Sequence, residues 1–315
     1  MKSVVRMPAG AKRVIRVALV LVCAAGMLVA VSGQALAKKP AGKKPAASKS
    51  KITPTTPITK GSTYLALGDS VTFGYEESTV TPAPDYPDAA SLVGYPEILG
   101  SELHMNVVNA ACPGETTASL INDTAQSNGC ENTPGKGNVG YRTLYPLHAS
   151  YSGSQLAFAV SYLKKHKNVR LVSLMIGAND FFLCEETTAD DCSSLVEQSA
   201  ALEAIGKNVH TIVSEIRNKA HYNGQLAIVN YYSTSPSEDA QLPLLNDAVD
   251  SGAKGFHVEI ADGFGAFHTA SAHSGDNPCT AGLLTQLSGG GCGIHPSYAG
   301  QSLLALALEK VIRFQ

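Results

Sequence analysis

The stretch "YLALGDSVTFGY", residues 64–75, joins an apolar run to a polar corner. Residues 64–67 are apolar, whereas Gly68, Asp69 and Ser70 follow at once and Gly74 comes four positions after the serine. A strand buried on both faces of a parallel sheet has a nearly continuous apolar sequence. Such sheets bind ligands at the carboxyl ends of their strands. The stretch therefore predicts a buried strand that ends at a functional corner.

From residue 61 onward, short apolar runs alternate with longer segments of helical period. The expected strands cover residues 62–67, 105–111, 169–177, 224–232 and 256–261. The expected helices cover residues 95–104, 154–167, 195–220, 242–255 and 297–314. This order predicts a parallel sheet of about five strands with helices on both faces. Long loops, which usually carry function in compact domains, are expected at residues 74–94, 127–152, 181–194 and 262–294.

The first 37 residues have the features of a secretion signal. Five Lys and Arg residues precede the 15-residue apolar run 17–31, and small residues at 35 and 37 offer a cleavage site after Ala37. The run is shorter than the roughly 20 residues of a membrane-spanning helix, so we expect export rather than an uncleaved anchor. A lipoprotein site at Cys23 is disfavoured, because Val22 stands where a small residue is required.

Residues 38–60 contain seven lysines, four prolines and no acidic residue, and they show no apolar period. We expect a disordered linker, either a solvated spacer or a segment attracted to anionic wall polymer or lipid. Residues 61–315 are expected to form one domain and a monomer. They hold 12 Lys and Arg against all 26 Asp and Glu, although the net charge of the whole chain is only −2. So acidic a domain should repel the phosphates of nucleic acid.

Six of the seven cysteines lie after residue 61. An even number in an exported chain predicts three disulfides. Pairing of neighbours along the chain is favoured, which joins Cys112 to Cys130, Cys184 to Cys192 and Cys279 to Cys292. Metal binding is the alternative, but the chain has no Cys-x-x-Cys motif and no close Cys/His set.

Four short blocks at the predicted strand ends are "GDSVTFGY", "NAACPGETT", "IGAND" and "GIHPS". In this order they resemble the blocks of the SGNH, or GDSL-type, hydrolase family, over residues 62–315. The resemblance implies a three-layer α/β/α flavodoxin-like fold and ester hydrolysis without a cofactor or metal. The chain has no Gly-x-Ser-x-Gly elbow, no phosphate-binding P-loop and no dinucleotide fingerprint.

The resemblance assigns roles to four residues. Ser70 would be the nucleophile, and His295 would be the base that takes its proton and returns it to the leaving alcohol. The Ser70 N–H, the Gly114 N–H and the Asn179 amide would form the oxyanion hole, where losing one donor typically costs about 10²–10³ in rate. Each residue also has a structural explanation, Ser70 as a helix cap, Gly114 and Asn179 as turn residues, and His295 as an ordinary surface histidine.

The resemblance leaves two alternatives for the group that orients His295. Family members usually carry an acid three residues before the histidine, but Cys292 occupies that position here. A disulfide-bonded cysteine cannot act as a carboxylate, so we expect its main-chain carbonyl to orient the imidazole, as in some members of the family. Asp276 from the preceding loop is the alternative. Asp69 and Asp180 are expected to brace loops.

The expected function is that of a secreted serine esterase of lipase or carboxylesterase type, acting on a lipid or small acyl ester. Apolar acyl chains are favoured if the aromatic residues of the mouth loops line the pocket. These residues are Tyr75, Phe181, Phe182, Phe264 and Phe267. Packing beneath the loops is the alternative for the same rings. The other functions considered are removal of acetyl groups from a polysaccharide and a non-catalytic wall-binding module.

Overall fold

The computed structural model describes residues 56–315, so the predicted signal peptide and residues 38–55 of the predicted linker lie outside the described residues. The last part of that predicted linker belongs to the folded unit. Ile58 is buried and pairs with Phe314, and its N–H donates to the Arg313 carbonyl at 2.9 Å. The fold therefore begins before residue 61, because an apolar side chain there covers the core.

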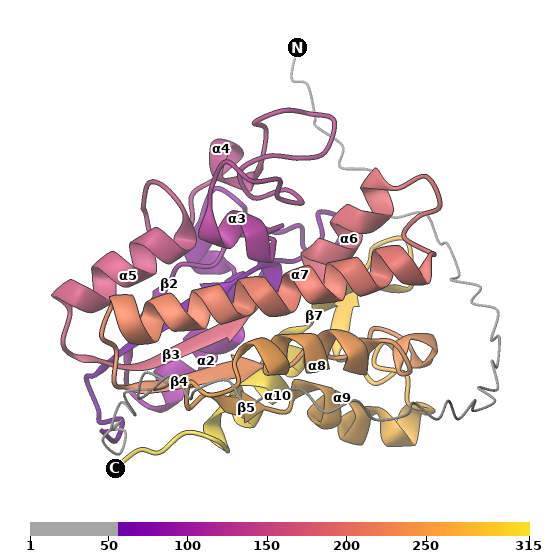
Figure 1. The fold of residues 1–315 in the computed structure, drawn as a ribbon. Helices are drawn as coiled ribbons and strands as arrows, with labels where there is room; N and C mark the ends of the chain where they lie inside the picture. Colours follow the sequence, from indigo (N-terminus) through magenta and orange to yellow (C-terminus); the bar gives the residue numbers. More distant parts are fainter. Residues whose placement is uncertain (1–55) are drawn as a thin grey trace, which may run out of the picture. The chain divides into compact units, whose positions relative to one another are not determined.

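The central sheet has five parallel strands in the order β2–β1–β3–β4–β5 (Figure 1). The strands are β1 (Thr63–Gly68), β2 (Asn106–Asn109), β3 (Val169–Met175), β4 (Gln225–Val229) and β5 (Glu259–Ala261). Strands β1 and β4 are buried along their whole length, as their apolar sequences predict. Gly68 pairs with Met175, so the carboxyl ends of β1 and β3 lie level at one edge. The predicted α/β fold with five parallel strands is confirmed.

Helices cover both faces of the sheet (Figure 1). On one face lie α3 (Thr117–Ile121), α5 (Gln155–Lys165), α7 (Leu195–Ser214), which continues into η2 (Glu215–Lys219), and α8 (Leu242–Gly252). On the other lie α2 (Tyr95–Glu102) and α10 (Tyr298–Glu309), with α9 (Gly263–Ser271) beside α10. The five helices predicted from their period are all present. Within residues 56–315, no helix is both long and apolar enough to span a membrane.

Several segments expected to be loops contain regular structure. Helix α6 (Ala178–Thr187) begins three residues after the end of β3, and α9 begins two residues after the end of β5. The segment 262–294 also contains most of an antiparallel hairpin of β6 (Leu284–Gln286) and β7 (Cys292–Pro296). The remaining connections hold α1 (Ser70–Phe73), η1 (Ala89–Ser91), α4 (Tyr141–Leu144), η3 (Pro236–Glu238) and η4 (Ala272–Ser274). All of these elements are too short or too mixed in composition to show a clear period. Except for α1 and η3, which lie outside the predicted loops, they show where the loop prediction was wrong.

Candidate active site

Neighbouring strand ends bring three predicted site residues to one edge of the sheet. Ser70 follows β1 as the first residue of α1, Gly114 lies in the turn after β2, and Asn179 is the second residue of α6. Asp69 caps α1, because its Oδ1 accepts a hydrogen bond from the Val71 N–H at 3.0 Å. This cap holds the first helical turn, and with it Ser70, in place.

Strand β7 brings His295 to Ser70, although 225 positions separate them in the sequence. The imidazole Nε2 lies 2.9 Å from the Ser70 Oγ, which is within reach for proton transfer. The other ring nitrogen, Nδ1, lies 2.8 Å from the Glu77 Oε1. The side chains of His295 and Glu77 are only 11% and 21% exposed. A hydroxyl, an imidazole and a carboxylate thus stand in line, and the carboxylate favours the tautomer with the proton on Nδ1.

Glu77 corrects the expectation for the group that orients His295. The Nδ1 atom faces the Glu77 carboxylate and not the main-chain carbonyl of Cys292. Asp276 forms no hydrogen bond or ion pair with His295; its carboxylate lies instead 4.0 Å from the Nδ1 of His268, where both side chains are about half exposed. Spacing along the chain could not identify the acid, since it lies 218 positions before the histidine.

Backbone contacts join the segment after α1 to the hairpin that carries the histidine. Val80 forms a bridge with Leu287, and the Ser288 N–H donates to the Thr79 carbonyl at 2.7 Å. These contacts hold Glu77 beside β7. The sequence signal for this arrangement was slight, namely an acidic pair at positions 76 and 77, shortly after the Gly-Asp-Ser corner.

Glu77 accepts four hydrogen bonds from the hairpin. Its Oε1 accepts from the Ile294 N–H at 2.7 Å, from the His295 N–H at 3.2 Å and from Nδ1, and its Oε2 accepts from the Thr285 hydroxyl at 2.5 Å. Gly293 makes room for the carboxylate, because a Cβ at that position would lie 2.1 Å from it. Burial by itself would raise the pKa of Glu77, but the hydrogen bonds and charge of His295 and the Thr285 donor together lower it to about 2. Glu77 is therefore an anion at neutral pH.

Donor groups suited to an oxyanion also gather at this edge. Among residues 56–315, neither the Ser70 nor the Gly114 backbone N–H finds a hydrogen-bond acceptor. The buried Asn179 donates from Nδ2 to the Asp69 Oδ2 at 3.3 Å, which leaves its second amide hydrogen available. Its Oδ1 accepts from the Asn128 Nδ2 at 3.2 Å. The arrangement can therefore offer three donors to a negatively charged oxygen near the serine.

A protein-family model described as "GDSL-like Lipase/Acylhydrolase family" matches residues 66–303. The chain belongs to this family. Its structure is similar to phospholipase A1 from Streptomyces albidoflavus, at 19% identity and a TM-score of 0.50, with 80% of this chain and 99% of that chain covered. It is also similar to a variant of the acetyl xylan esterase Axe2 from Geobacillus stearothermophilus, at 17% identity and a TM-score of 0.49, covering 82% and 97%. No curated protein sequence matches the chain. The family and its fold, predicted from the four blocks, are confirmed.

All three predicted disulfides are present in this GDSL-type chain. They join Cys112 to Cys130, Cys184 to Cys192 and Cys279 to Cys292. The first closes the loop that carries Gly114, the second links α6 to the segment before α7, and the third anchors the hairpin that carries His295. Each bridge thus holds a segment that bears or adjoins a site residue. Such bonds persist in oxidising compartments.

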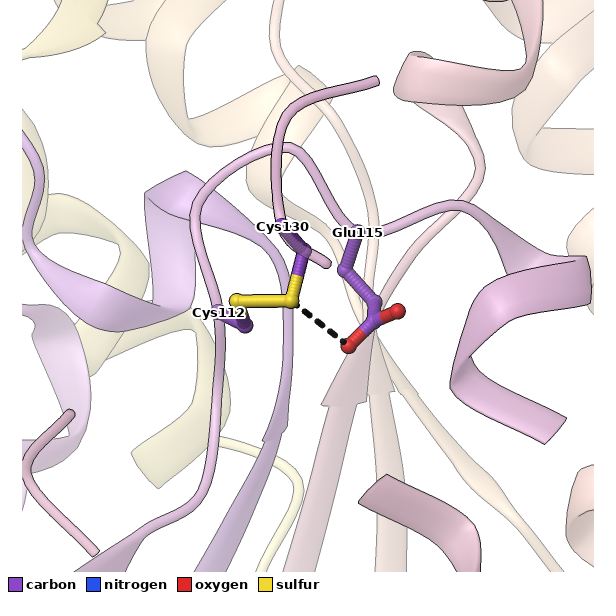
Figure 2. A group of neighbouring side chains, drawn as sticks. All are labelled: Cys112, Glu115 and Cys130. Carbon is purple, nitrogen blue, oxygen red and sulfur yellow. Dashed lines mark hydrogen bonds between the residues drawn. A yellow bond between two sulfur atoms is a disulfide. The ribbon is translucent and has the colours of Figure 1, made fainter. Parts of the chain in front are cut away.

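Cys112, Glu115 and Cys130 are the one group of potential metal ligands among residues 56–315 (Figure 2). Both sulfurs belong to one disulfide and cannot act as thiolates. Burial raises the pKa of Glu115 well above its ordinary value, which favours the neutral carboxyl. The Gln155 Nε2 donates to this carboxyl at 3.0 Å and also to the Gly68 carbonyl at 3.0 Å. Through Gln155, the group therefore supports the turn at Gly68 that precedes Ser70.

Four of the five aromatic residues expected at the pocket lie on α6 and α9. Phe267 is not a pocket residue, because it is 1% exposed and its ring stacks on Tyr232 in the core. That expectation was wrong because α9, which turns this side chain inward, was not predicted. Phe264 is half-buried on the same helix. Phe181 is half-buried and Phe182 is 36% exposed on α6, so a place for these three rings in the pocket stays a prediction.

Tyr75 lies directly against the imidazole, with 4.9 Å between its ring centroid and that of His295. Three further tyrosines surround it. Its ring stacks on Tyr86 at 5.3 Å and meets Tyr141 edge-on at 6.0 Å, and Tyr145 contacts both of these. Sequence analysis did not find this tyrosine cluster, because its members come from two separate loop segments that share no period.

Proposed function

We propose that this chain is a secreted serine esterase that hydrolyses carboxylic esters through an acyl-enzyme. The observation that carries the proposal is the line of contacts from the Ser70 Oγ through His295 to Glu77, at 2.9 and 2.8 Å. A serine hydroxyl is a weak nucleophile unless a base adjoins it. Membership of a family of lipases and acylhydrolases supports the same reaction class.

In the first half-reaction, the Ser70 Oγ attacks the ester carbonyl carbon while His295 Nε2 takes its proton. The Glu77 anion stabilises the resulting imidazolium. Negative charge that develops on the carbonyl oxygen meets the N–H groups of Ser70 and Gly114 and the amide of Asn179. The imidazolium then gives its proton to the alcohol oxygen as the carbon–oxygen bond breaks. Water repeats the sequence on the acyl-enzyme and releases the acid.

The proposed substrate is a lipid ester or small acyl ester. The aromatic residues of α6 and α9 that remain partly exposed would favour an apolar acyl chain. The tyrosine cluster supports a second candidate, removal of acetyl groups from a polysaccharide. His295 must deliver its proton to the alcohol, so the ring of Tyr75 against it adjoins the alcohol side. Tyrosines provide both a stacking face and hydroxyl groups for a sugar.

Secretion is supported by the three disulfides and by the signal-like first 37 residues. We place the cleavage site after Ala37, which N-terminal sequencing of the exported protein would check. The lysine-rich segment that follows would be drawn to anionic wall polymer or lipid. The domain itself is proposed to act as a monomer, which light scattering after size-exclusion chromatography measures.

The test compares wild type, Ser70→Ala and the exposed-serine control Ser91→Ala on para-nitrophenyl esters from acetate to palmitate and on acetylated xylan. We expect Ser70→Ala to lose about 10⁴-fold or more in kcat, with Ser91→Ala unchanged. A fluorophosphonate should label Ser70 and no other serine. Preference for long-chain esters would favour the lipase candidate, and preference for acetylated xylan the other. If the wild-type protein hydrolysed none of these esters and did not react with the fluorophosphonate, the proposal would be contradicted. A non-catalytic binding module would then be the remaining interpretation.

A further inference from the structure

The side-chain amide of Asn179 is held from two sides. Its Nδ2 donates to the Asp69 Oδ2 at 3.3 Å, and its Oδ1 accepts from the Asn128 Nδ2 at 3.2 Å. An amide turned by 180° would place its oxygen against the Asp69 carboxylate and its NH₂ group against another NH₂ group. These two contacts together therefore decide in which direction the remaining N–H of Asn179 points.

Asp69 depends in turn on Tyr231, which follows β4. The Tyr231 hydroxyl donates to the Asp69 Oδ2, the same oxygen that accepts from Asn179. The backbone of Tyr231 is fixed by Asn246 on α8, whose side-chain amide pairs with the Tyr231 N–H and carbonyl, each at 3.0 Å. Tyr231 is 5% exposed. The position of its hydroxyl is therefore fixed by buried contacts.

Asn128 links two parts of the site that come from different strands. Its backbone N–H donates to the Gly114 carbonyl at 2.8 Å, while its side chain donates to Asn179. The disulfide between Cys112 and Cys130 closes the loop that contains both Gly114 and Asn128. One residue therefore couples the Gly114 peptide to the Asn179 amide.

We propose that Tyr231 and Asn128 are positioning residues of the oxyanion hole, Tyr231 acting through the Asp69 carboxylate and Asn128 directly on Asn179. The inference rests on the proposed ester hydrolysis and deepens it. Neither residue contacts the reacting atoms. Both act on the transition state by keeping one N–H of Asn179 directed at the oxygen that becomes charged.

The pH dependence of kcat distinguishes a positioning role from a purely structural one, which would leave it unchanged. Burial raises the pKa of Asp69 to about 6, even though Tyr231, Val71, His295 and Asn179 all act to lower it. The other titratable groups that face it are Asp180, Tyr95 and Tyr232. Asp69 accepts from Asn179 as a carboxylate, so protonation at acid pH weakens its hold on the amide. Tyr231→Phe removes a donor, raises the pKa of Asp69 further, and should move the acid limb of the kcat profile to higher pH.

The experiment measures kcat and KM for para-nitrophenyl butyrate in Tyr231→Phe and Asn128→Ala, each alone and combined with Asn179→Ala. We expect each single change to lower kcat about tenfold, with KM nearly unchanged. In the Asn179→Ala background neither change should lower kcat further, because the amide that it orients is absent. Tyr222→Phe is the matched control. It removes another buried hydroxyl, which donates to the Gln225 carbonyl at the opposite end of β4, and should leave kcat and the acid limb unchanged.

Asn128→Asp is a second test of the direction in which the Asn179 amide points. A carboxylate at this position would attract the NH₂ group of Asn179 and favour the turned amide, so its kcat should fall below that of Asn128→Ala. Tyr231→Phe keeps the ring and the backbone bonds to Asn246, and circular dichroism would verify that it folds. Losses that persist in the Asn179→Ala background, or a Tyr231→Phe enzyme with unchanged kcat, would overturn the inference alone. Wild type that is inactive and not labelled at Ser70 would instead overturn the proposed function.

Discussion

Replacing Glu77 by Gln removes the negative charge beside His295 and keeps the shape of the side chain. The amide oxygen of the glutamine can still accept from the His295 Nδ1 and from the Ile294 N–H. The Thr285 hydroxyl, which now donates to the second carboxylate oxygen, can rotate to accept from the new NH₂ group. The substitution therefore tests the charge of Glu77 and not the position of the imidazole.

The size of the effect follows from the surroundings of the carboxylate. Its pKa falls from an ordinary 4.5 to about 2, which corresponds to a preference of about 3 kcal/mol for the ionised form. If a similar free energy acts on the imidazolium that forms in the transition state, losing it lowers kcat about 10²-fold. Glu77→Ala should lower kcat further, because it also removes the acceptor for Nδ1.

The assay is the hydrolysis of para-nitrophenyl butyrate at neutral pH by wild type, Glu77→Gln, Glu77→Ala and Glu76→Gln. Glu76 is the matched control, since it is an adjacent half-buried acid whose carboxylate makes no hydrogen bond with residues 56–315. Because the Glu76 charge acts on His295 only through space, we expect its substitution to lower kcat much less than Glu77→Gln does. A Glu77→Gln enzyme as fast as wild type, together with an inactive Asp276→Ala enzyme, would refute the reasoning and return the orienting role to the loop before the hairpin.

Acid pH provides an independent check on the same carboxylate. Because the pKa of Glu77 is lowered on folding, its contribution to stability is complete above about pH 4.5 and is lost as the pH falls towards 2. Over this range the melting temperature of wild type should fall more steeply than that of Glu77→Gln, as thermal unfolding followed by circular dichroism would measure. Parallel curves for the two proteins would contradict the assignment of a strongly lowered pKa.

Three further predictions concern the surroundings of the site. Gly293→Ala should lower kcat, because the added Cβ would lie 2.1 Å from the Glu77 carboxylate. Gly289→Ala is the control and should leave kcat unchanged, since nothing lies within 4 Å of its added Cβ. Steady-state kinetics of both variants test this prediction. Glu115→Gln should raise the melting temperature at pH 8 relative to wild type. Burial raises the pKa of Glu115, so ionisation of this carboxyl destabilises the folded protein as the pH rises, whereas glutamine stays neutral. An unchanged or lower melting temperature would count against a buried neutral carboxyl. Replacing both Cys279 and Cys292 by Ala should lower the melting temperature by about 5–10 °C. It should also lower kcat, because this disulfide anchors the hairpin that carries His295. Calorimetry and steady-state kinetics on the same sample measure the two effects.

Local sequence was sufficient to predict the sheet and the edge at which the site lies. The apolar runs at 62–67 and 169–177 correspond to β1 and β3, because strands covered on both faces need apolar side chains at nearly every position. Parallel strands end at a common edge, so Ser70 and Asn179 could be placed together before any contact was known. The disulfides were predicted for a similar reason, since each joins cysteines close along the chain.

The partners of the reactive groups were decided only by tertiary structure. Glu77 reaches His295 through the pairing of its segment with the hairpin and through the missing Cβ of Gly293. Tyr231 reaches Asp69 across the sheet, and α9 turns the ring of Phe267 into the core. Hydrophobic period reports which face an element buries, and that information is local. A hydrogen-bond partner depends on where two distant segments place single atoms, which is set only when those segments pack against each other.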